Sequence, residues 1–476
     1  MVPAAERELF ENTGVARAVM RLALPTVAGQ IILVIYNVAD TFFVGLAGDA
    51  AKLTAVTVCM PAFMILSAVA NLFGIGGGSV MARAMGSGDS QRGRSAAAFA
   101  FWGCLTAGLV YSLLATAFRG VLVDLLGGTD PRVHRLAEEY LTLTVGVGGA
   151  ATAMSVLFSH LIRSEGRSLH AAVGIALGGL LNIALDPLFM FVLLPPGREA
   201  FGAAVATVIS NVISLIYFVL VSFALRQSSQ LCFRPSMALC TRGVVRAVLV
   251  TGAPACIMTL FENLSYAVLD KLMSLNGVAA QAGIGVAKKV NMLAHCAVRG
   301  ISQGALPLIA YNYAAGKLRR MRSAFRITCL MAVGAALVCM AANLIWSREL
   351  VGLFIHREPR ALRYGTEFLR ILCVGGPFSA AAYTVISFFQ AVGQGSRSFL
   401  LAVLRKGMVD IPLMFALNSA LPVFGIVMAT PVTDALCCAA ACGLYLYFIN
   451  KLVRSAPRRH PRGRLGRGRS PEGETI

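Results

Sequence analysis

Long apolar segments alternate with short polar segments along the whole chain. A helix of about 20 apolar residues crosses the hydrocarbon core of a bilayer. Segments of this length predict twelve transmembrane helices, at roughly 19–47, 53–82, 97–118, 137–161, 170–194, 201–225, 245–274, 279–310, 324–346, 366–392, 399–420 and 424–450. The pattern therefore predicts an all-α integral membrane protein.

The two halves of the chain repeat each other. The segment LALPTVAG aligns with VTGAPACI, which places Pro25 against Pro254 at an offset of 229 positions (254 − 25). Gly48 and Gly277 keep the same offset. Each unit holds six spans, an even number, so both units enter the membrane from the same side. We therefore predict two parallel six-helix repeats, an architecture in which transporters place a site between two halves.

Basic residues gather in alternate connections, which predicts that these connections and both termini face the cytoplasm. The clustered residues are Arg83, Arg92, Arg94, Arg163, Arg167, Arg226, Arg234, Arg242, Arg246, Lys317, Arg319, Arg320, Arg322, Arg397, Arg405 and Lys406. The start, MVPAAERELFENTG, lacks the basic and short apolar regions of a cleaved signal peptide, so the first span is expected to be retained. The predicted location is the inner (cytoplasmic) membrane of a cell.

These spans divide the chain into five parts. We expect a cytoplasmic segment at 1–18, an N-lobe at 19–225, a cytoplasmic linker at 226–244, a C-lobe at 245–450 and a basic tail at 451–476. The tail carries eight basic residues, and such a cluster beside a last span is attracted to anionic lipid. It lacks interleaved aromatic residues and a folded nucleic-acid module, so nucleic-acid binding is not expected.

Composition agrees with a membrane protein. Hydrophobic residues make up 57% of the chain and charged residues only 13%, whereas a soluble domain has about 25% charged residues. The twelve cysteines form no CxxC pair and no Cys/His spacing suited to zinc. We interpret them as small apolar packing residues.

One acid interrupts the first span. Asp40 is the only charged residue between Arg21 and Asp49. A charge near the centre of a membrane helix costs roughly 2.5–3.5 kcal/mol on insertion scales, so an ionisable residue there predicts a function. Tyr36 lies one helical turn before it, and Pro25 is expected to bend the same helix.

A second acid lies in the fifth span. Asn182 and Asp186 are four residues apart and so share one helical face. Pro187 follows, and because proline has no backbone N–H it frees a carbonyl and loosens the helix. Thr207 adds a hydroxyl near the start of the sixth span.

These polar groups predict an ion-coupling site in the first half of the chain. Asp40, Asn182, Asp186, Thr207 and Tyr36 offer hard oxygen ligands of the kind that suit Na⁺. Alternatively, an apolar environment disfavours the charged form of a carboxylate, so the two acids would load and release protons. The competing interpretation is a polar clamp that only holds helices together. No cofactor beyond H⁺ or Na⁺ is expected.

The second half does not copy these acids. With Pro25 set against Pro254, Asp40 aligns with Leu269, one residue before Asp270. Asp410 likewise lies one residue before the position that aligns with Asp186. Glu262 is a further acid deep in the seventh span, and we predict that it touches substrate or ion. Structural ion pairing is the favoured alternative for Asp270 and Asp410, and Lys288 and Lys289 are candidates to neutralise one of the C-lobe acids.

Two motifs suggest other functions but lack the context for them. GSGD at 86–89 resembles a motif of intramembrane aspartyl proteases, yet Asp89 lies in an Arg-rich loop, whereas that chemistry needs two acids sharing a proton. GIGGGS at 74–79 has no preceding strand and no phosphate-binding lysine, so its glycines are expected to permit close helix packing. We predict no enzyme activity.

Taken together, several segments resemble the multidrug and toxin extrusion (MATE) family, in its DinF-like branch. They are LPTVAGQIILVIYNVADTFFVG, GGSVMARAMGSGD, LNIALDPLFMF, GAAVATVIS, ISQGALPLIAYNYAAGK and FQAVGQGSRS. The resemblance covers about residues 15–450 and implies a V-shaped pair of six-helix lobes that alternates between two openings. It implies that organic cations leave in exchange for H⁺ or Na⁺.

The resemblance also implies site residues. The family's N-lobe cation site corresponds to Asp40, Asn182 and Asp186, and its bent first helix corresponds to Pro25. Family members with a C-lobe site place an acid where this chain has Glu262, and an aspartate in the tenth span, where this chain offers only Gln390. A complete C-lobe site is therefore not expected.

We thus expect a monomeric antiporter that exports amphipathic organic cations. The alternative is a lipid-linked precursor or polysaccharide flippase of the same superfamily, which would need a basic central cavity for a pyrophosphate group. A passive channel is a third hypothesis, and it would conduct independently of Asp40.

Overall fold

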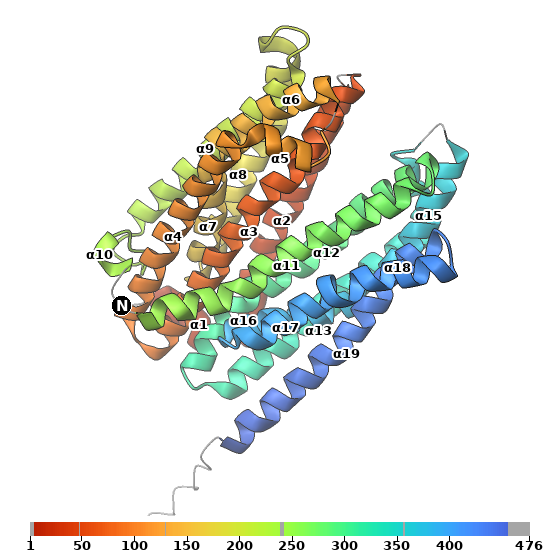
Figure 1. Ribbon diagram of the computed structural model, residues 1–476. Helices are drawn as coiled ribbons and strands as arrows, with labels where there is room; N and C mark the ends of the chain where they lie inside the picture. Colours follow the sequence, from red (N-terminus) through yellow and green to blue (C-terminus); the bar gives the residue numbers. More distant parts are fainter. Residues whose placement is uncertain (1–3, 47, 129, 239–241, 356–357, 456–476) are drawn as a thin grey trace, which may run out of the picture.

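The computed structural model describes residues 4–46, 48–128, 130–238, 242–355 and 358–455, and these residues form helices and connecting turns without a strand. Figure 1 shows two helical bundles, one from each half of the chain, lying along each other. The predicted all-α fold in two repeats is confirmed. Most of the predicted basic tail lies outside the described residues.

The first bundle, the N-lobe, follows a short helix α1 (Ala4–Glu11). Its elements are α2 (Val15–Leu46), α3 (Ala50–Ser87), α4 (Ser90–Ala117), α5 (Arg119–Leu125), α6 (Pro131–Leu141), the π-helix η1 (Thr142–Val147), α7 (Gly149–Ser164), α8 (Ser168–Pro187), the π-helix η2 (Leu188–Leu193) and α9 (Glu199–Ala224). Asp49, Asp89 and Asp130 begin α3, α4 and α6 as N-caps, each accepting a backbone N–H of the first turn.

The second bundle, the C-lobe, follows a connection that contains α10 (Pro235–Ala238). Its elements are α11 (Arg242–Ser274), α12 (Val278–Ala314), α13 (Leu318–Ile345), α14 (Ser347–Gly352), α15 (Pro359–Val374), α16 (Gly376–Ala391), α17 (Gly395–Val403), the π-helix η3 (Leu404–Val409), α18 (Asp410–Ala420) and α19 (Phe424–Ser455).

The membrane spans differ in how regular they are. Among the described residues, eight single helices are long and apolar enough to cross a membrane, and two bent pairs raise the number to ten. The bent pairs, Pro131–Val147 with Gly149–Ser164 (48°) and Pro359–Val374 with Gly376–Ala391 (44°), are the fourth predicted span of each repeat. The bend is therefore a property of the repeat.

Two further predicted spans, 279–310 and 399–420, correspond to α12 and to the broken run from α17 to α18. Charged residues reduce the apolar character of both segments. The run from α17 to α18 holds Arg405, Lys406 and Asp410 within six positions, and η3 interrupts it there. Arg405, Lys406 and Asp410 are all buried inside the C-lobe.

The lobes meet at the end of the molecule that carries the N-terminus. There α3 packs on α11 and α2 packs on α12, through glycines on α3, α11 and α12. A Cβ on Gly252 would lie 1.8 Å from the carbonyl oxygen of Leu72, and one on Gly300 would lie 2.6 Å from the Cα of Val27. Small residues let helix backbones approach this closely. The prediction that the glycines at 74–79 serve helix packing is confirmed at Gly76, whose Cβ would lie 2.3 Å from the backbone of α11.

Beyond this seam the two lobes separate. The contacts just described involve the first half of α2 and α11 and the second half of α3 and α12. No hydrogen bond or ion pair joins the opposite halves of these four helices among the described residues. The molecule is therefore V-shaped, closed at the N-terminal end and open at the other.

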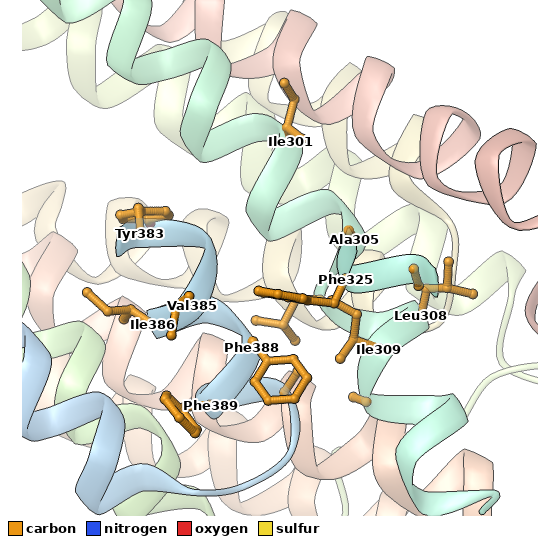
Figure 2. Close-up of a cluster of buried hydrophobic side chains, with 14 of the residues drawn as sticks. Ile301, Ala305, Leu308, Ile309, Phe325, Tyr383, Val385, Ile386, Phe388 and Phe389 are labelled. Atoms are coloured by element: carbon orange, nitrogen blue, oxygen red, sulfur yellow. The ribbon is translucent and has the colours of Figure 1, made fainter. Parts of the chain in front are cut away.

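A large apolar cluster stabilises the C-lobe at the closed end. Figure 2 shows side chains from α12, α13 and α16 converging there. Phe325 of α13 packs edge-on against Phe388 of α16, with ring centroids 5.0 Å apart. This cluster gives the closed end of the C-lobe a rigid core to which the N-lobe docks.

Helix α1 also lies at the closed end, and it contacts the C-lobe although it precedes the N-lobe in sequence. Phe10 stacks on Tyr311 of α12 at 4.9 Å, and Arg320 donates from Nε to the carbonyl of Phe10 at 2.8 Å. A Cβ on Gly166 of the N-lobe would lie 3.0 Å from the same Phe10 ring. Phe10 therefore packs between the two lobes.

Candidate functional site

The predicted N-lobe residues converge in the half where the lobes are apart. Asn182 of α8 donates from Nδ2 to Oδ1 of Asp186 at 3.2 Å, and the same amide reaches the hydroxyl of Thr207 on α9 at 3.3 Å. Asp186 is fully buried. The four-residue spacing on α8 produces the first contact, and the packing of α9 on α8 produces the second.

Helix α2 brings Asp40 and Tyr36 to the same place. Tyr36 packs against α8 at Gly179, where an added Cβ would lie 3.4 Å from the tyrosine ring. Asp40, one turn further along, is buried and lies close enough to Asp186 for the two carboxylates to interact electrostatically. The structure thus brings all five predicted N-lobe residues into one cluster.

This cluster contains oxygen atoms without a partner. Oδ1 of Asp40, Oδ2 of Asp186 and Oδ1 of Asn182 are buried and accept no hydrogen bond from the described part of the chain. None of the ion pairs found in the described residues involves Asp40 or Asp186. Buried acceptors normally have a donor or a cation beside them, because leaving them unpaired costs about 1–3 kcal/mol each. The cluster can therefore take up a proton or a small cation.

The two predicted helix-distorting prolines differ in effect. Pro187 ends α8, and the chain continues as the π-helix η2. The predicted loosening of the helix beside Asp186 is therefore present. Pro25 lies inside α2, which continues through it from Val15 to Leu46 at the face that contacts the C-lobe.

The three C-lobe acids singled out from the sequence are each paired with a base. Glu262 pairs with Arg299 of α12, and Asp270 pairs with Lys288, as one of the predicted alternatives required. Asp410 is fully buried; it accepts from Lys406 Nζ at 2.9 Å and from Ser265 Oγ at 2.6 Å. The acid that is predicted to touch substrate or ion thus already has a counter-ion in this conformation.

A fourth pair was not anticipated from the sequence. Asp434 of α19 accepts from Nε of Arg405 at 2.8 Å, and both side chains are almost fully buried. Arg405 and Lys406 are predicted from the sequence to lie in a cytoplasmic connection, which is wrong: both lie inside the C-lobe, with 5% and 4% of their surface exposed. Their charge is tolerated because each has an acid in contact.

These pairs surround a small cavity in the C-lobe. Its charged and polar lining includes Glu262, Lys288, His295, Arg405 and Asp434. Gln390 does not line it. This residue lies instead at the seam between the lobes, where its backbone carbonyl accepts from Ser79 at 2.6 Å and from Arg83 at 3.2 Å.

Sequence reasoning missed three further polar residues. Tyr140 of α6 lies within electrostatic range of both Asp40 and Asp186, and Arg299 neutralises Glu262. Arg163 was assigned to a connection, yet it is 3% exposed and contacts the ring of His160 at 3.3 Å. Arg299 could have been found from the sequence, because it is a basic residue in an otherwise apolar segment. Nothing in the sequence distinguishes Tyr140 from other tyrosines.

Comparison with known proteins identifies the two repeats independently. The family model MatE matches the chain twice, at residues 25–188 and 254–416. The two matches begin 229 positions apart (254 − 25), the offset found between Pro25 and Pro254. Together they cover more than half of the chain.

Curated relatives align over nearly the whole length. The multidrug export protein MepA of Staphylococcus haemolyticus is 25% identical over 93% of this chain and 96% of its own length. MepA of Staphylococcus aureus is 26% identical over 91% of this chain and 94% of its own length. The relatives assign no branch within the family.

Solved structures share the fold. A crystal structure of MATE in complex with MaL6 superposes with a TM-score of 0.88 at 21% identity, covering 95% of this chain and 100% of that chain. A MOP superfamily transporter from Pyrococcus furiosus, described as having a binding pocket of reverse polarity, superposes with a TM-score of 0.85 at 21% identity, covering 95% and 99%. At this identity the likeness concerns the fold alone.

Proposed function

The chain belongs to the MatE family and is a multi-pass membrane protein, and from that premise we propose that it is a secondary antiporter. It exports amphipathic organic cations in exchange for H⁺ or Na⁺ by alternating access. The resemblance to the multidrug export protein MepA supports the cargo class. The termini face the cytoplasm of the inner membrane, so the conformation described here opens outward, and the protein works as a monomer.

One observation carries this proposal. Asp40 and Asp186 are buried without a basic partner, whereas Glu262, Asp270, Asp410 and Asp434 each contact a base. Among the intramembrane acids that the structure describes, those without a basic partner therefore lie in the N-lobe cluster, where a coupling cation would meet them. In this proposal the N-lobe binds the coupling ion, and each of these four C-lobe acids is neutralised by its basic partner.

The oxygen atoms of the N-lobe cluster suit both candidate ions. A proton needs a single carboxylate oxygen, and Oδ2 of Asp186 and Oδ1 of Asp40 are free to receive one. Na⁺ needs several hard oxygens, which Asp40, Asp186, Asn182 and Thr207 supply together. Uptake of either ion removes the repulsion between the two carboxylates and lets α2 and α8 approach, which favours one opening of the lobes over the other.

The proposal is tested in liposomes with an imposed pH gradient, with ethidium as the cationic dye. Lumenal pH and dye movement are followed with and without Na⁺ for the wild type, Asp40→Asn and Asp186→Asn. Asp124→Asn is the matched control, because Asp124 is exposed and contacts His134 rather than a residue of the cluster. Dye-driven collapse of the gradient that needs Asp40 and Asp186 but not Asp124 supports proton antiport.

The other outcomes are equally informative. Dye movement that requires Na⁺ and both acids assigns Na⁺ as the coupling ion. Dye flux that is independent of Asp40 indicates a passive channel. If no dye moves in any preparation, cation export is overturned and the flippase alternative has to be tested with a lipid-linked substrate.

A further inference from the structure

The seam between the lobes is lined by arginines at its solvent-exposed edge. A pocket there has Arg83 of α3 and Arg92 of α4 on the N-lobe side, and Arg246 of α11 on the C-lobe side. Its remaining lining comes from α11 and from the turn at Val392 and Gly393. No acid lines this pocket among the described residues.

Arg83 lines the pocket and already bridges the lobes. Its Nη1 donates to Ser79 Oγ at 2.9 Å and to the carbonyl of Ala391 at 3.0 Å. Gly393, with a positive φ of 76°, permits this approach: a Cβ there would lie 2.7 Å from Nη1 of Arg83. Carbonyl and hydroxyl partners orient the guanidinium but leave its charge uncompensated.

The other two arginines are available to a ligand. Arg92 and Arg246 are exposed, and neither side chain forms a hydrogen bond or ion pair with the residues that the structure describes. The neighbouring acid, Asp89, accepts the backbone N–H of Arg92 at 3.0 Å as the N-cap of α4 and does not line the pocket. Three guanidinium groups thus face one pocket without a carboxylate.

From this arrangement we infer that the pocket of Arg83, Arg92 and Arg246 binds a phosphate group and that the bound phosphate holds the two lobes together at this end. Guanidinium groups match the planar spacing of phosphate oxygens and bind them through paired, charge-assisted hydrogen bonds. The pocket lies where α3 ends and α4 and α11 begin, at the expected membrane boundary. The phosphate can therefore come from a lipid headgroup or from solution.

The site is specific to this conformation. Arg83 and Arg92 belong to one lobe and Arg246 to the other, so separation of the lobes at the seam would remove part of the site. A ligand shifts a conformational equilibrium by the ratio of its affinities for the two states. Phosphate binding therefore stabilises the state closed at the N-terminal end and slows the exchange of states. This inference does not depend on which ion or cargo the protein transports.

The experiment measures thermal unfolding of the purified full-length protein in detergent. One arm titrates inorganic phosphate against sodium chloride of equal ionic strength, and the other adds short-chain phosphatidylglycerol or phosphatidylcholine. We expect a saturable rise of the unfolding midpoint with inorganic phosphate, with phosphatidylglycerol, or with both, and none with chloride or phosphatidylcholine. The arm that responds identifies the source of the phosphate.

Arg246→Gln is the test variant and Arg94→Gln the matched control. Arg94 is exposed two residues beyond Arg92 and does not line the pocket, and both variants keep the basic tail. Arg246→Gln should weaken the apparent affinity about tenfold, since it removes a charge-assisted pair. The inference is overturned if neither phosphate source stabilises the wild type, or if Arg94→Gln weakens binding as much as Arg246→Gln does.

Discussion

Asn182 and Asp186 are joined by a hydrogen bond of 3.2 Å across one turn of α8, and this contact fixes which oxygens of the N-lobe cluster remain free. The same amide nitrogen also reaches Thr207 on α9. Asn182 therefore uses its donor capacity within the protein and leaves its own oxygen, and one oxygen of Asp186, without partners. The cluster therefore leaves oxygen acceptors free for a proton or a cation from outside the protein.

Replacement of Asn182 should affect transport more than stability. Asn182→Ala removes the donor that orients Asp186 and one of the free oxygens. We expect ion-coupled dye transport to fall about tenfold, while the loss of one hydrogen bond lowers stability by only about 1 kcal/mol. Asn343→Ala, which removes a buried amide on α13, is the control. Equal transport losses in both variants would show that Asn182 has no special role.

The pair of Arg405 and Asp434 should behave as a buried ion pair whose members are needed together. Asp434→Asn leaves the guanidinium of Arg405 buried without its counter-ion, which typically costs about 3–5 kcal/mol. The double replacement Arg405→Met with Asp434→Leu removes both charges and should restore most of that loss. Thermal unfolding of Arg405→Met, Asp434→Leu and the double variant gives the coupling between the residues. Additive losses would argue against the pair.

Close packing at the seam should be sensitive to a single methyl group. Gly252→Ala would place a Cβ 1.8 Å from the carbonyl oxygen of Leu72, so the lobes could not close as they do here. Overpacking of this kind costs about 1–3 kcal/mol, which changes a conformational equilibrium by about 5–150-fold. Labelling of a cysteine introduced at Ser79, in a chain without other reactive cysteines, should become faster. Gly285→Ala, where an added Cβ would meet no described atom within 4 Å outside its own helix backbone and chain neighbours, should leave the rate unchanged.

The docking of α1 should weaken in acid. The hydroxyl of Tyr311 donates to Oε1 of Glu11 at 2.5 Å and Lys317 lies at 3.0 Å, and these contacts lower the pKa of Glu11 from 4.5 to about 2. Because the folded pKa lies below the unfolded one, Glu11 stabilises the docked helix fully above pH 4.5 and loses that contribution between pH 4.5 and 2.

Pepsin, which is active in this range, provides the measurement. Cleavage between Leu9 and Phe10, both buried in the docked helix, should accelerate as the pH falls from 4.5 towards 2, relative to a reference peptide. In Glu11→Gln the relative rate should be high and independent of pH. A wild-type rate that stays flat over this interval would contradict the role given to Glu11.

The sequence was a good guide wherever a contact follows from local spacing or from the repeat. The four-residue interval between Asn182 and Asp186 predicts their shared face, and the offset between Pro25 and Pro254 predicts two equivalent bundles. The partners of Glu262 and Asp434 were not predictable in this way. They depend on the rotation of α11, α12 and α19 about their axes, which tertiary packing decides.

Charged residues in short connections were the main source of error. Arg405 and Lys406 come soon after a glycine-containing turn and so resemble topogenic loop residues, yet α17 carries the chain into the C-lobe before it reaches them. The two repeats share a backbone feature that their residues do not predict. The fourth span bends at Gly148 in the N-lobe and at Gly375 in the C-lobe, and no sequence motif predicts this bend.

The two unpaired carboxylates of the N-lobe also set a limit on the energetics of export. Among the described residues, Asp40 and Asp186 are the intramembrane acids without a base, so at most two protons can be carried per cycle on such groups. With one proton exchanged for a monovalent cation, the cycle moves no net charge and only the pH difference drives it. With two, one net charge enters per cycle, and each 100 mV of membrane potential adds about 2.3 kcal/mol to the driving force. The number of acids protonated per turnover therefore decides whether the voltage contributes to export at all.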